Sequence, residues 1–284
     1  MAFDLTHARH DPAHCLAPGL FRSLKRGDRK KLKLDVVYKY GDHEQIEFKG
    51  AEPLGADDLR VLQGLVAMAG PAGIILTPEP SADAPRQLRL LLEMPHPEVT
   101  AAKDNALVVK GSYRQLAREI GYADDGGSQF KAIRDCLERL WGVSIIVQSG
   151  RKRVGCRLLS SYASDEDTGH LFIALNPRLA DAILGKRSHT RIEMSEVRAL
   201  ASDPARLIHQ RLCGWIDPGK SGRAELDTLC GYVWPDAASV GTMRKRRFDA
   251  RAALDELRGA GWTLEEYAPG KYEISRPGAG RPPA

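Results

Sequence analysis

The chain contains the same order of expected elements twice, and this repetition constrains its fold more than any other feature. Residues 112–159 are predicted to form a helix, a short glycine-containing turn, a second helix with a tryptophan near its end, and two strands joined by a tight turn. Residues 225–275 show the same order. Two helices joined by such a turn are a helix-turn-helix, and the hairpin after them is the wing of a winged helix. We therefore predict an α+β fold of two tandem winged-helix domains with small antiparallel β-hairpins.

The first copy has clear helix boundaries. Ser112 is expected to cap one helix and Gly121 to end it, while Ser128 is expected to cap a second helix that continues to Trp141. The residues predicted to face outward on this second helix are polar or basic: Gln129, Lys131 and Arg134. The hairpin turn after it carries three consecutive cations: Arg151, Lys152 and Arg153. Both sets, together with Ser128, are candidate contacts to an anionic partner.

The second helix of the second copy carries the longest unbroken run of basic residues. It reads SVGTMRKRRFDARAALDELR from Ser239 to Arg258, and Ser239 or Thr242 is expected to cap it. Its consecutive cations are Arg244, Lys245, Arg246 and Arg247. Apolar residues at helical spacing are expected to pack on the domain: Val240, Met243, Ala250, Leu254 and Leu257. The pattern therefore predicts an amphipathic helix with one apolar and one cationic side.

Such a helix is suited to the major groove of DNA, where arginine binds guanine through two hydrogen bonds. A recognition helix usually meets the bases with its N-terminal end, so the expected base contacts are Ser239, Thr242, Arg244, Lys245 and Arg246. Arg247 is expected to reach past the core to a phosphate, Arg251 to meet phosphate or solvent, and Lys271 to serve the second wing. Taken alone, a run of cations is more often a solvated helix face, and the net charge of +5 is only mildly basic.

The length of 284 residues suits two domains. We predict an N-terminal domain at residues 1–186 and a C-terminal domain at residues 187–284, with a Pro/Gly-rich tail that is disordered from about residue 277. The five cysteines are widely spaced without a CxxC motif, and are expected to be reduced. No run of 18 apolar residues occurs, so we expect a cytoplasmic protein without a membrane partner.

The first residues contain three histidines, His7, His10 and His14, beside Cys15. These residue types bind zinc, but their spacing matches no compact zinc motif and no second ligand pair follows. We expect a solvated or partly docked arm and no metal. The basic run at residues 22–33 is either a mobile solvated face or an arm that contacts phosphates.

The acidic residues Asp165, Glu166 and Asp167 could suggest a metal-dependent DNA-processing enzyme such as a nuclease or primase. These residues are expected in a polar loop, and no second acidic cluster completes a two-metal site. The chain has no GxxxxGK[ST] motif for a nucleotide phosphate and no histidine pair on an apolar strand for DNA nicking. We therefore expect no catalytic residue and no cofactor.

The chain also resembles, almost end to end, the iteron-binding replication initiators of IncQ-type broad-host-range plasmids. The stretches that carry this resemblance are long and unusual: HDPAHCLAPGLFRSLKRG, EPLGADDLRVLQGLVAMAG, RDCLERLWGVSII, YASDED, RLIHQRLCGWIDPGK and DTLCGYVWPDAASVGTMRKRR. The segment at residues 190–215 is similar to the start of the second winged helix in the wider class of plasmid initiators.

The resemblance implies a non-enzymatic protein that binds direct repeats, or iterons, in double-stranded DNA at a plasmid origin. It implies opening of adjacent A·T-rich DNA and entry of a plasmid-encoded helicase and primase. It also implies a homodimer in exchange with a monomer. The self-association surface would lie in the N-terminal domain, and the C-terminal domain would be the main iteron reader. A winged-helix transcriptional repressor without origin opening is the alternative, because it would need the same DNA-binding parts.

Overall fold

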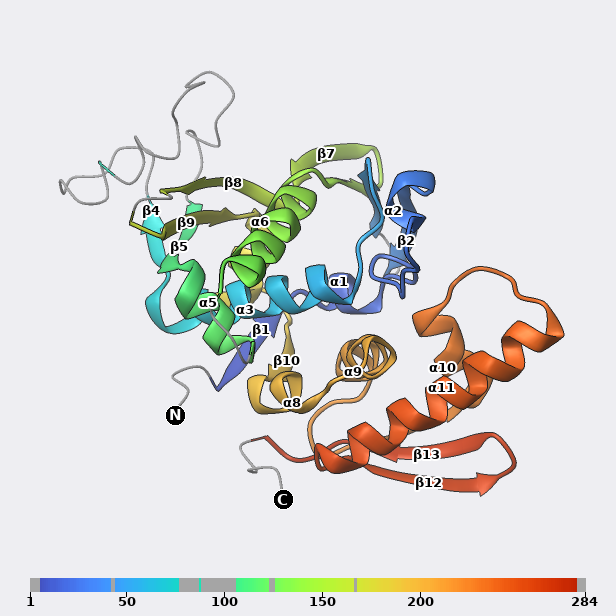
Figure 1. The fold of residues 1–284 in the computed structure, drawn as a ribbon. Helices are drawn as coiled ribbons and strands as arrows, with labels where there is room; N and C mark the ends of the chain where they lie inside the picture. Colours follow the sequence, from blue (N-terminus) through green and yellow to red (C-terminus); the bar gives the residue numbers. More distant parts are fainter. Residues whose placement is uncertain are drawn as a thin grey trace.

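The computed structural model describes residues 6–41, 44–76, 87, 106–122, 126–165 and 168–279 (Figure 1). Two features of the sequence extend beyond these ranges, namely Glu166 and Asp167 of the acidic loop and residues 280–284 of the tail. Within the described residues, the prediction of an α+β fold with tandem winged helices is confirmed. None of the described helices has the length and apolar character needed to span a bilayer.

Two four-stranded antiparallel sheets form the N-terminal part. One has the order β2-β3-β6-β7, made of β2 (Leu34–Tyr40), β3 (Glu44–Gly50), β6 (Ser144–Ser149) and β7 (Lys152–Arg157). The other has the order β4-β5-β9-β8, made of β4 (Ile74–Leu76), β5 (Ala106–Ser112), β9 (His170–Leu175) and β8 (Leu159–Ser164). The predicted first wing is therefore the hairpin β6–β7, and it forms the outer half of the first sheet.

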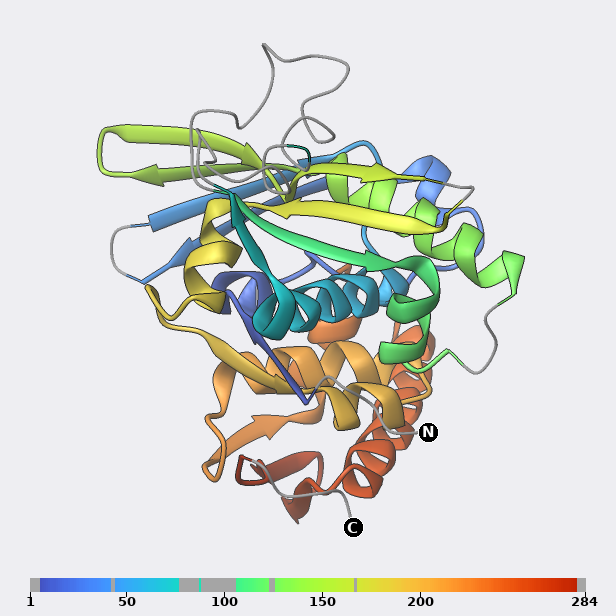
Figure 2. The ribbon, with the colours of Figure 1, turned by 90° about the vertical axis from the view of Figure 1, so that its left-hand side faces the viewer.

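The helix α3 (Ala56–Ala72) lies between these sheets and the C-terminal elements (Figure 2). Leu59, Leu62 and Leu65 are fully buried, because α3 packs against neighbours on several sides. Gly64 permits one of these close contacts, since a Cβ atom there would lie 2.3 Å from the Cγ2 atom of Ile120. This glycine lets α3 approach the C-terminal end of the helix at residues 113–119.

That first helix-turn-helix consists of α5 (Tyr113–Glu119) and α6 (Gly127–Trp141), and α7 (Pro177–Ile183) follows later. Ser112 caps α5 as predicted, because its hydroxyl accepts a hydrogen bond of 3.1 Å from the backbone N–H of Gln115. The prediction for Ser128 is wrong. The extended residue before α6 is Gly126, which is acceptable at this position, and Ser128 lies inside the first turn.

The C-terminal winged helix contains α9 (Asp203–Trp215), α10 (Leu226–Val233) and α11 (Val240–Gly259). Its sheet has the order β11-β13-β12, from β11 (Ser221–Glu225), β12 (Thr263–Ala268) and β13 (Lys271–Ser275). The second wing is therefore the hairpin β12–β13. The third strand, β11, is a further element that the sequence pattern did not predict.

The apolar stripe of α11 is confirmed in its C-terminal half, where Ala250, Leu254 and Leu257 are buried against α9 and α10. The prediction for Val240 is wrong, because this side chain is 89% exposed. The first turns of α11 lie at the outer end of the C-terminal part (Figure 1), where Met243 is only partly buried against the core and Val240 is not covered.

The two parts share one continuous core, and the first segment of the chain joins them. The strand β1 (His7–His10) pairs antiparallel with β10 (Thr190–Glu193), and α1 (Pro12–Leu16) packs against α9. The short helices α2 (Asp28–Lys31) and α8 (Met194–Ala199) complete the described elements. The strand pair crosses the predicted domain boundary at residue 186.

Of the two expectations for the histidine arm, the solvated one is wrong, and the segment is docked more fully than the partly docked alternative. His10 and His14 are buried, and their rings meet edge to face with centroids 5.8 Å apart. Burial lowers the pKa of His10 to about 3 and that of His14 to about 4, so both imidazoles are neutral near pH 7. This segment is packed because β1 pairs with a strand of the C-terminal half.

Candidate DNA interface

The most exposed part of the predicted interface is the N-terminal half of α11. Ser239 caps this helix, since its hydroxyl accepts a hydrogen bond of 3.3 Å from the backbone N–H of Thr242. The hydroxyls of these two residues also lie 3.0 Å apart, so both side chains support the helix start. The unpaired backbone N–H groups of a helix N-terminus favour an anion there.

Three cations of α11 are exposed: Arg244 and Lys245 in its first half, and Arg251 further along, where it interacts with Tyr272 on β13. Arg244 has no carboxylate within salt-bridge distance among the described residues. Lys245 forms an ion pair of 3.2 Å with Asp249 one turn later, yet its side chain stays 76% exposed. Exposed pairs of this kind are weak, so both cations are available to phosphates or bases.

Arg246 and Arg247 have structural contacts instead. The guanidinium of Arg246 donates to the carbonyl of Asp236 at 2.7 Å and lies 5.8 Å from the centre of the Trp234 ring. Arg247 binds the carboxylate of Asp227 on α10 through two hydrogen bonds of 2.6 and 2.7 Å, which lowers the pKa of that carboxyl. The sequence pattern could not distinguish these bracing arginines from Arg244 and Lys245, because all four belong to one run.

The turn between α10 and α11 is attached to the basic run near the N-terminus. Arg22 forms an ion pair with Asp236, and the backbone N–H of Ser23 donates to the carbonyl of Val233 at 2.9 Å. Further along the run, Arg29 pairs with the buried Asp58 at 3.0 Å. The run is therefore partly folded, and its exposed cations are Lys25, Arg26, Lys30, Lys31 and Lys33.

The corresponding helix of the first copy, α6, has a more nearly neutral outer face. Lys131 pairs with Asp135 at 3.1 Å, and the hydroxyl of Ser128 donates to the side chain of Gln129 at 2.7 Å. Arg134 is half-buried, with its guanidinium 6.0 Å from the centre of the Tyr113 ring. The structure places these four predicted contact residues on one helix, but α6 presents fewer exposed cations than α11.

The two wings both turn at a glycine with positive φ, Gly150 at 57° and Gly270 at 71°. At the first wing, Arg151 and Lys152 are exposed, whereas Arg153 pairs with Glu47 on β3 at 3.1 Å. At the second wing, Lys271 lies 3.6 Å from Glu225 and remains half-exposed. The predicted wing cations thus lie at hairpin ends, where winged helices reach the DNA backbone.

A buried polar cluster lies behind α11. The Nε2 atom of His209 is 2.5 Å from a carboxylate oxygen of Glu196, and Trp262 donates to the same oxygen at 3.1 Å. Burial alone would lower the pKa of His209, but Cys213 and Glu196 outweigh it and raise this pKa to about 10. The side chains of Glu196, His209 and Cys213 lie close enough together to resemble a set of metal ligands. The imidazolium and the carboxylate satisfy each other, however: burial alone would raise the pKa of Glu196, but His209, with smaller contributions from Trp262 and Arg276, lowers it.

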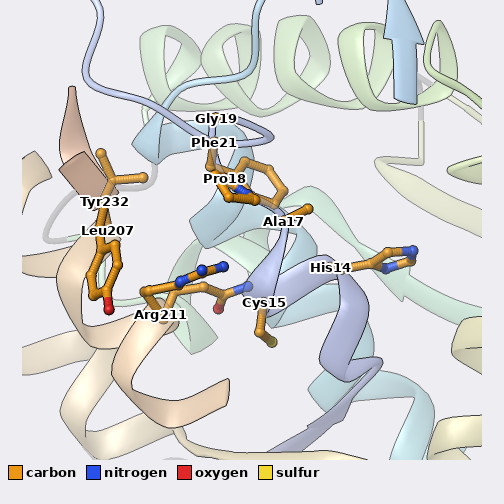
Figure 3. Close-up of a pocket in the computed structure, with 10 residues that line it drawn as sticks. His14, Cys15, Ala17, Pro18, Gly19, Phe21, Leu207, Arg211 and Tyr232 are labelled. Carbon is orange, nitrogen blue, oxygen red and sulfur yellow. The ribbon is translucent and has the colours of Figure 1, made fainter. Parts of the chain in front are cut away.

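A small cavity lies between the two parts of the molecule, beside α1, α9 and α10 (Figure 3). His14, Cys15 and Arg211 line it, and Arg211 lies over the Tyr232 ring at 5.0 Å. Its volume is about 20 Å³, which is enough for a water molecule and far below the size of a cofactor site.

The fold is similar to that of solved structures with little sequence identity. Domains 2 and 3 of RctB, in two crystal structures, are 12% identical to this chain, with TM-scores of 0.58 and 0.55. These comparisons cover 94% of this chain and 98% and 96% of the RctB chains. The Pi initiator protein in complex with iteron DNA is also 12% identical, covering 69% of this chain and 92% of its own, with a TM-score of 0.42.

No curated protein sequence matches the chain significantly. The sequence model of replication protein C, RepC, by contrast, matches residues 2–278 and so spans nearly all of it. With this match and the tandem winged-helix fold, the chain belongs to the RepC family of replication proteins.

Proposed function

We propose that this RepC-family protein initiates plasmid replication by binding direct repeats of double-stranded DNA at the origin. The single observation that carries this proposal is the exposed start of α11, where Arg244 and Lys245 project from a winged helix. The major groove of DNA is about 12 Å wide and admits such a helix. Phosphates on both sides of the groove would meet the cations that do not reach bases.

The contacts that α11 makes with neighbouring elements separate its structural arginines from those that are available to DNA. Arg247 is held by Asp227 and Arg246 by the carbonyl of Asp236, so these side chains fix the helix against α10 and the preceding turn. Arg244 and Lys245 are then the leading candidates for base contacts. Ser239 and Thr242 lie at the helix start, where backbone N–H groups favour a phosphate.

The remaining predicted contacts would place the DNA backbone. Arg151 and Lys152 on the first wing and Lys271 on the second are suited to phosphates, since wing residues commonly meet the backbone beside the groove. Gln129 and Lys131 on α6 would meet an adjoining segment of the same duplex. Contacts of this kind add affinity that falls with salt and carry little sequence information.

The proposal includes steps that follow from the resemblance to plasmid initiators. After binding, the protein would promote opening of adjacent A·T-rich DNA and entry of the helicase and primase, without catalysing a reaction itself. A homodimer in exchange with a monomer, a self-association surface within residues 1–186, an iteron-reading domain at residues 187–284, and a cytoplasmic location belong to the same proposal.

The experiment that tests it separates an initiator from a transcriptional repressor. Footprinting of the purified protein on a supercoiled origin plasmid should protect a series of direct repeats. Permanganate should then modify thymines in the neighbouring A·T-rich region. Protection of repeats without permanganate reactivity would favour the repressor. Absence of specific protection would exclude both functions.

A further inference from the structure

One exposed side chain on α11 plays no part in the function described so far. Phe248 is 73% exposed and lies in the middle of the cationic face. It is two positions before the buried Ala250, which at 100° per residue places it on the opposite side of the helix. Phe248 therefore contributes nothing to the core of its own domain.

The surroundings of Phe248 indicate what covers it. The residues one helical turn away on the same side are Arg244, Lys245 and Arg251, all of them exposed. An apolar pocket on a protein partner would have to accommodate these cations around the ring. The major groove offers phosphates to the cations and the C5-methyl groups of thymines to an apolar side chain. The charge around the ring thus favours DNA as the occupant.

The position of Phe248 along the helix is also consistent with a contact to DNA. Arg244 precedes Phe248 by four residues, or about 6 Å along the axis, and successive base pairs are about 3.4 Å apart. A helix that directs Arg244 at one base pair therefore brings Phe248 close to a base pair about two steps away. A phenylalanine forms no hydrogen bonds with base edges, so the methyl group is the feature it can distinguish.

We propose that Phe248 is a specificity-determining residue that packs against the methyl group of a thymine in the origin repeat. This inference rests on the proposed function, because it requires α11 to lie in the major groove. It adds an apolar contact to a surface that otherwise recognises bases through charge and hydrogen bonds. The ligand class is a thymine-containing base pair at a defined position of the repeat.

Replacing single thymines by deoxyuridine tests the proposal, since this change removes only the C5-methyl group. Fluorescence anisotropy would measure binding to a duplex with one origin repeat, to each single-deoxyuridine version and to a scrambled duplex. We expect at least one replacement to weaken wild-type binding about three- to tenfold, as loss of a buried methyl contact does. The Phe248→Ala variant should bind the all-thymine duplex more weakly by a similar factor and should be insensitive to that same replacement.

The Tyr267→Ala variant provides a matched control, because Tyr267 is another exposed aromatic residue, 53% accessible, on the second wing. It should keep the methyl dependence of the wild type. An unchanged ratio of thymine to deoxyuridine binding in Phe248→Ala would overturn the inference, and so would an unchanged affinity. If the wild type did not prefer the repeat to the scrambled duplex, the proposed function itself would fail, which is a distinct result.

Discussion

The two helix-turn-helix units share a plan but differ in what their second helix presents to solvent. On α6, Lys131 is paired and Arg134 is half-buried against an aromatic ring. On α11, the first turns lie at the outer end of the C-terminal part (Figure 1) and carry projecting cations around an exposed phenylalanine. The neighbouring sheet explains part of this difference. The first wing is joined to two further strands, β3 and β2, whereas the second belongs to a compact three-stranded sheet.

This difference teaches that a repeated fold need not repeat a function. The first unit is built into two sheets and the central helix α3, so its second helix has less free surface. The second unit has a smaller sheet, and its second helix is long enough, at 20 residues, to be anchored at one end and free at the other. We expect α11 to dominate sequence recognition and α6 to assist.

The largest effect should come from the exposed cations of α11. Replacing Arg244 and Lys245 by alanine should weaken binding to the origin repeat by about 2–6 kcal/mol, from about 1–3 kcal/mol for each lost base contact. Binding to random DNA should fall much less. The matched change on α6, Gln129→Ala with Lys131→Ala, should cost less on the same repeat. If anisotropy titrations showed equal losses of binding free energy for the two double variants, α11 would not dominate recognition over α6.

The next largest effect concerns the buried pair that supports the second unit. Glu196→Gln removes the charge that faces His209 and leaves an unpaired buried imidazolium, so it should lower the free energy of unfolding by about 3–5 kcal/mol. Urea denaturation monitored by tryptophan fluorescence would measure this loss. The exposed Glu265→Gln variant serves as a control and should change stability by less than about 0.5 kcal/mol. If both variants lost the same small amount of unfolding free energy, the pair of Glu196 and His209 would not be needed for stability.

The two halves should also respond to pH in opposite directions. His10 and His14 have a lowered pKa, so the unfolded chain binds more protons, and stability should fall as the pH decreases from about 6.5 toward 4. His209 has a raised pKa, so its contribution is complete below about pH 6.5 and is lost as the pH rises toward about 10. Each histidine changes the unfolding free energy by at most about 1.4 kcal/mol per pH unit.

Denaturation curves at several pH values would check both slopes. The His14→Leu variant should lose part of the decline on the acidic side and keep the alkaline one. A decline of the same size on the acidic side in this variant would mean that the buried imidazole of His14 is not its source.

The smallest effect should come from the first wing. Removing the exposed cations Arg151 and Lys152 should reduce the salt dependence of binding by up to about two units of slope, with little change in sequence preference. Arg153→Ala is the matched control, because its guanidinium already pairs with Glu47 and should add little to the slope. An unchanged slope in the double variant would show that this wing does not touch the DNA backbone.

The local patterns predicted much of this fold. Helical spacing and Ser112 located α5, alternation around glycine turns located both wings, and the apolar stripe identified the packed half of α11. What they missed depends on contacts distant in sequence. The burial of His10 requires a strand about 180 residues later, and the exposure of Val240 follows from the absence of a neighbour beneath it.

The candidate interface shows the same limit. Its cationic helix could be recognised from the residues alone, because charge and helical period are local properties. The roles within the run could not, because Arg247 is distinguished from Arg244 only by a carboxylate on another helix. Phe248 is not among the contacts predicted from the sequence, although its spacing of four from Arg244 and three from Arg251 places it on the same face of the helix.

The pairing of β1 with β10 has a consequence for the order of events during synthesis. Its two strands are separated by about 180 residues, which a ribosome adds in roughly 10–40 seconds at 5–20 residues per second. For that time β1 lacks its strand partner, although α3, against which it also packs, and the first sheet are already available for folding. This part of the junction between the two halves can therefore close only after residues 190–193 have been made, and the C-terminal winged helix, which follows β10 in the chain, folds onto it later still.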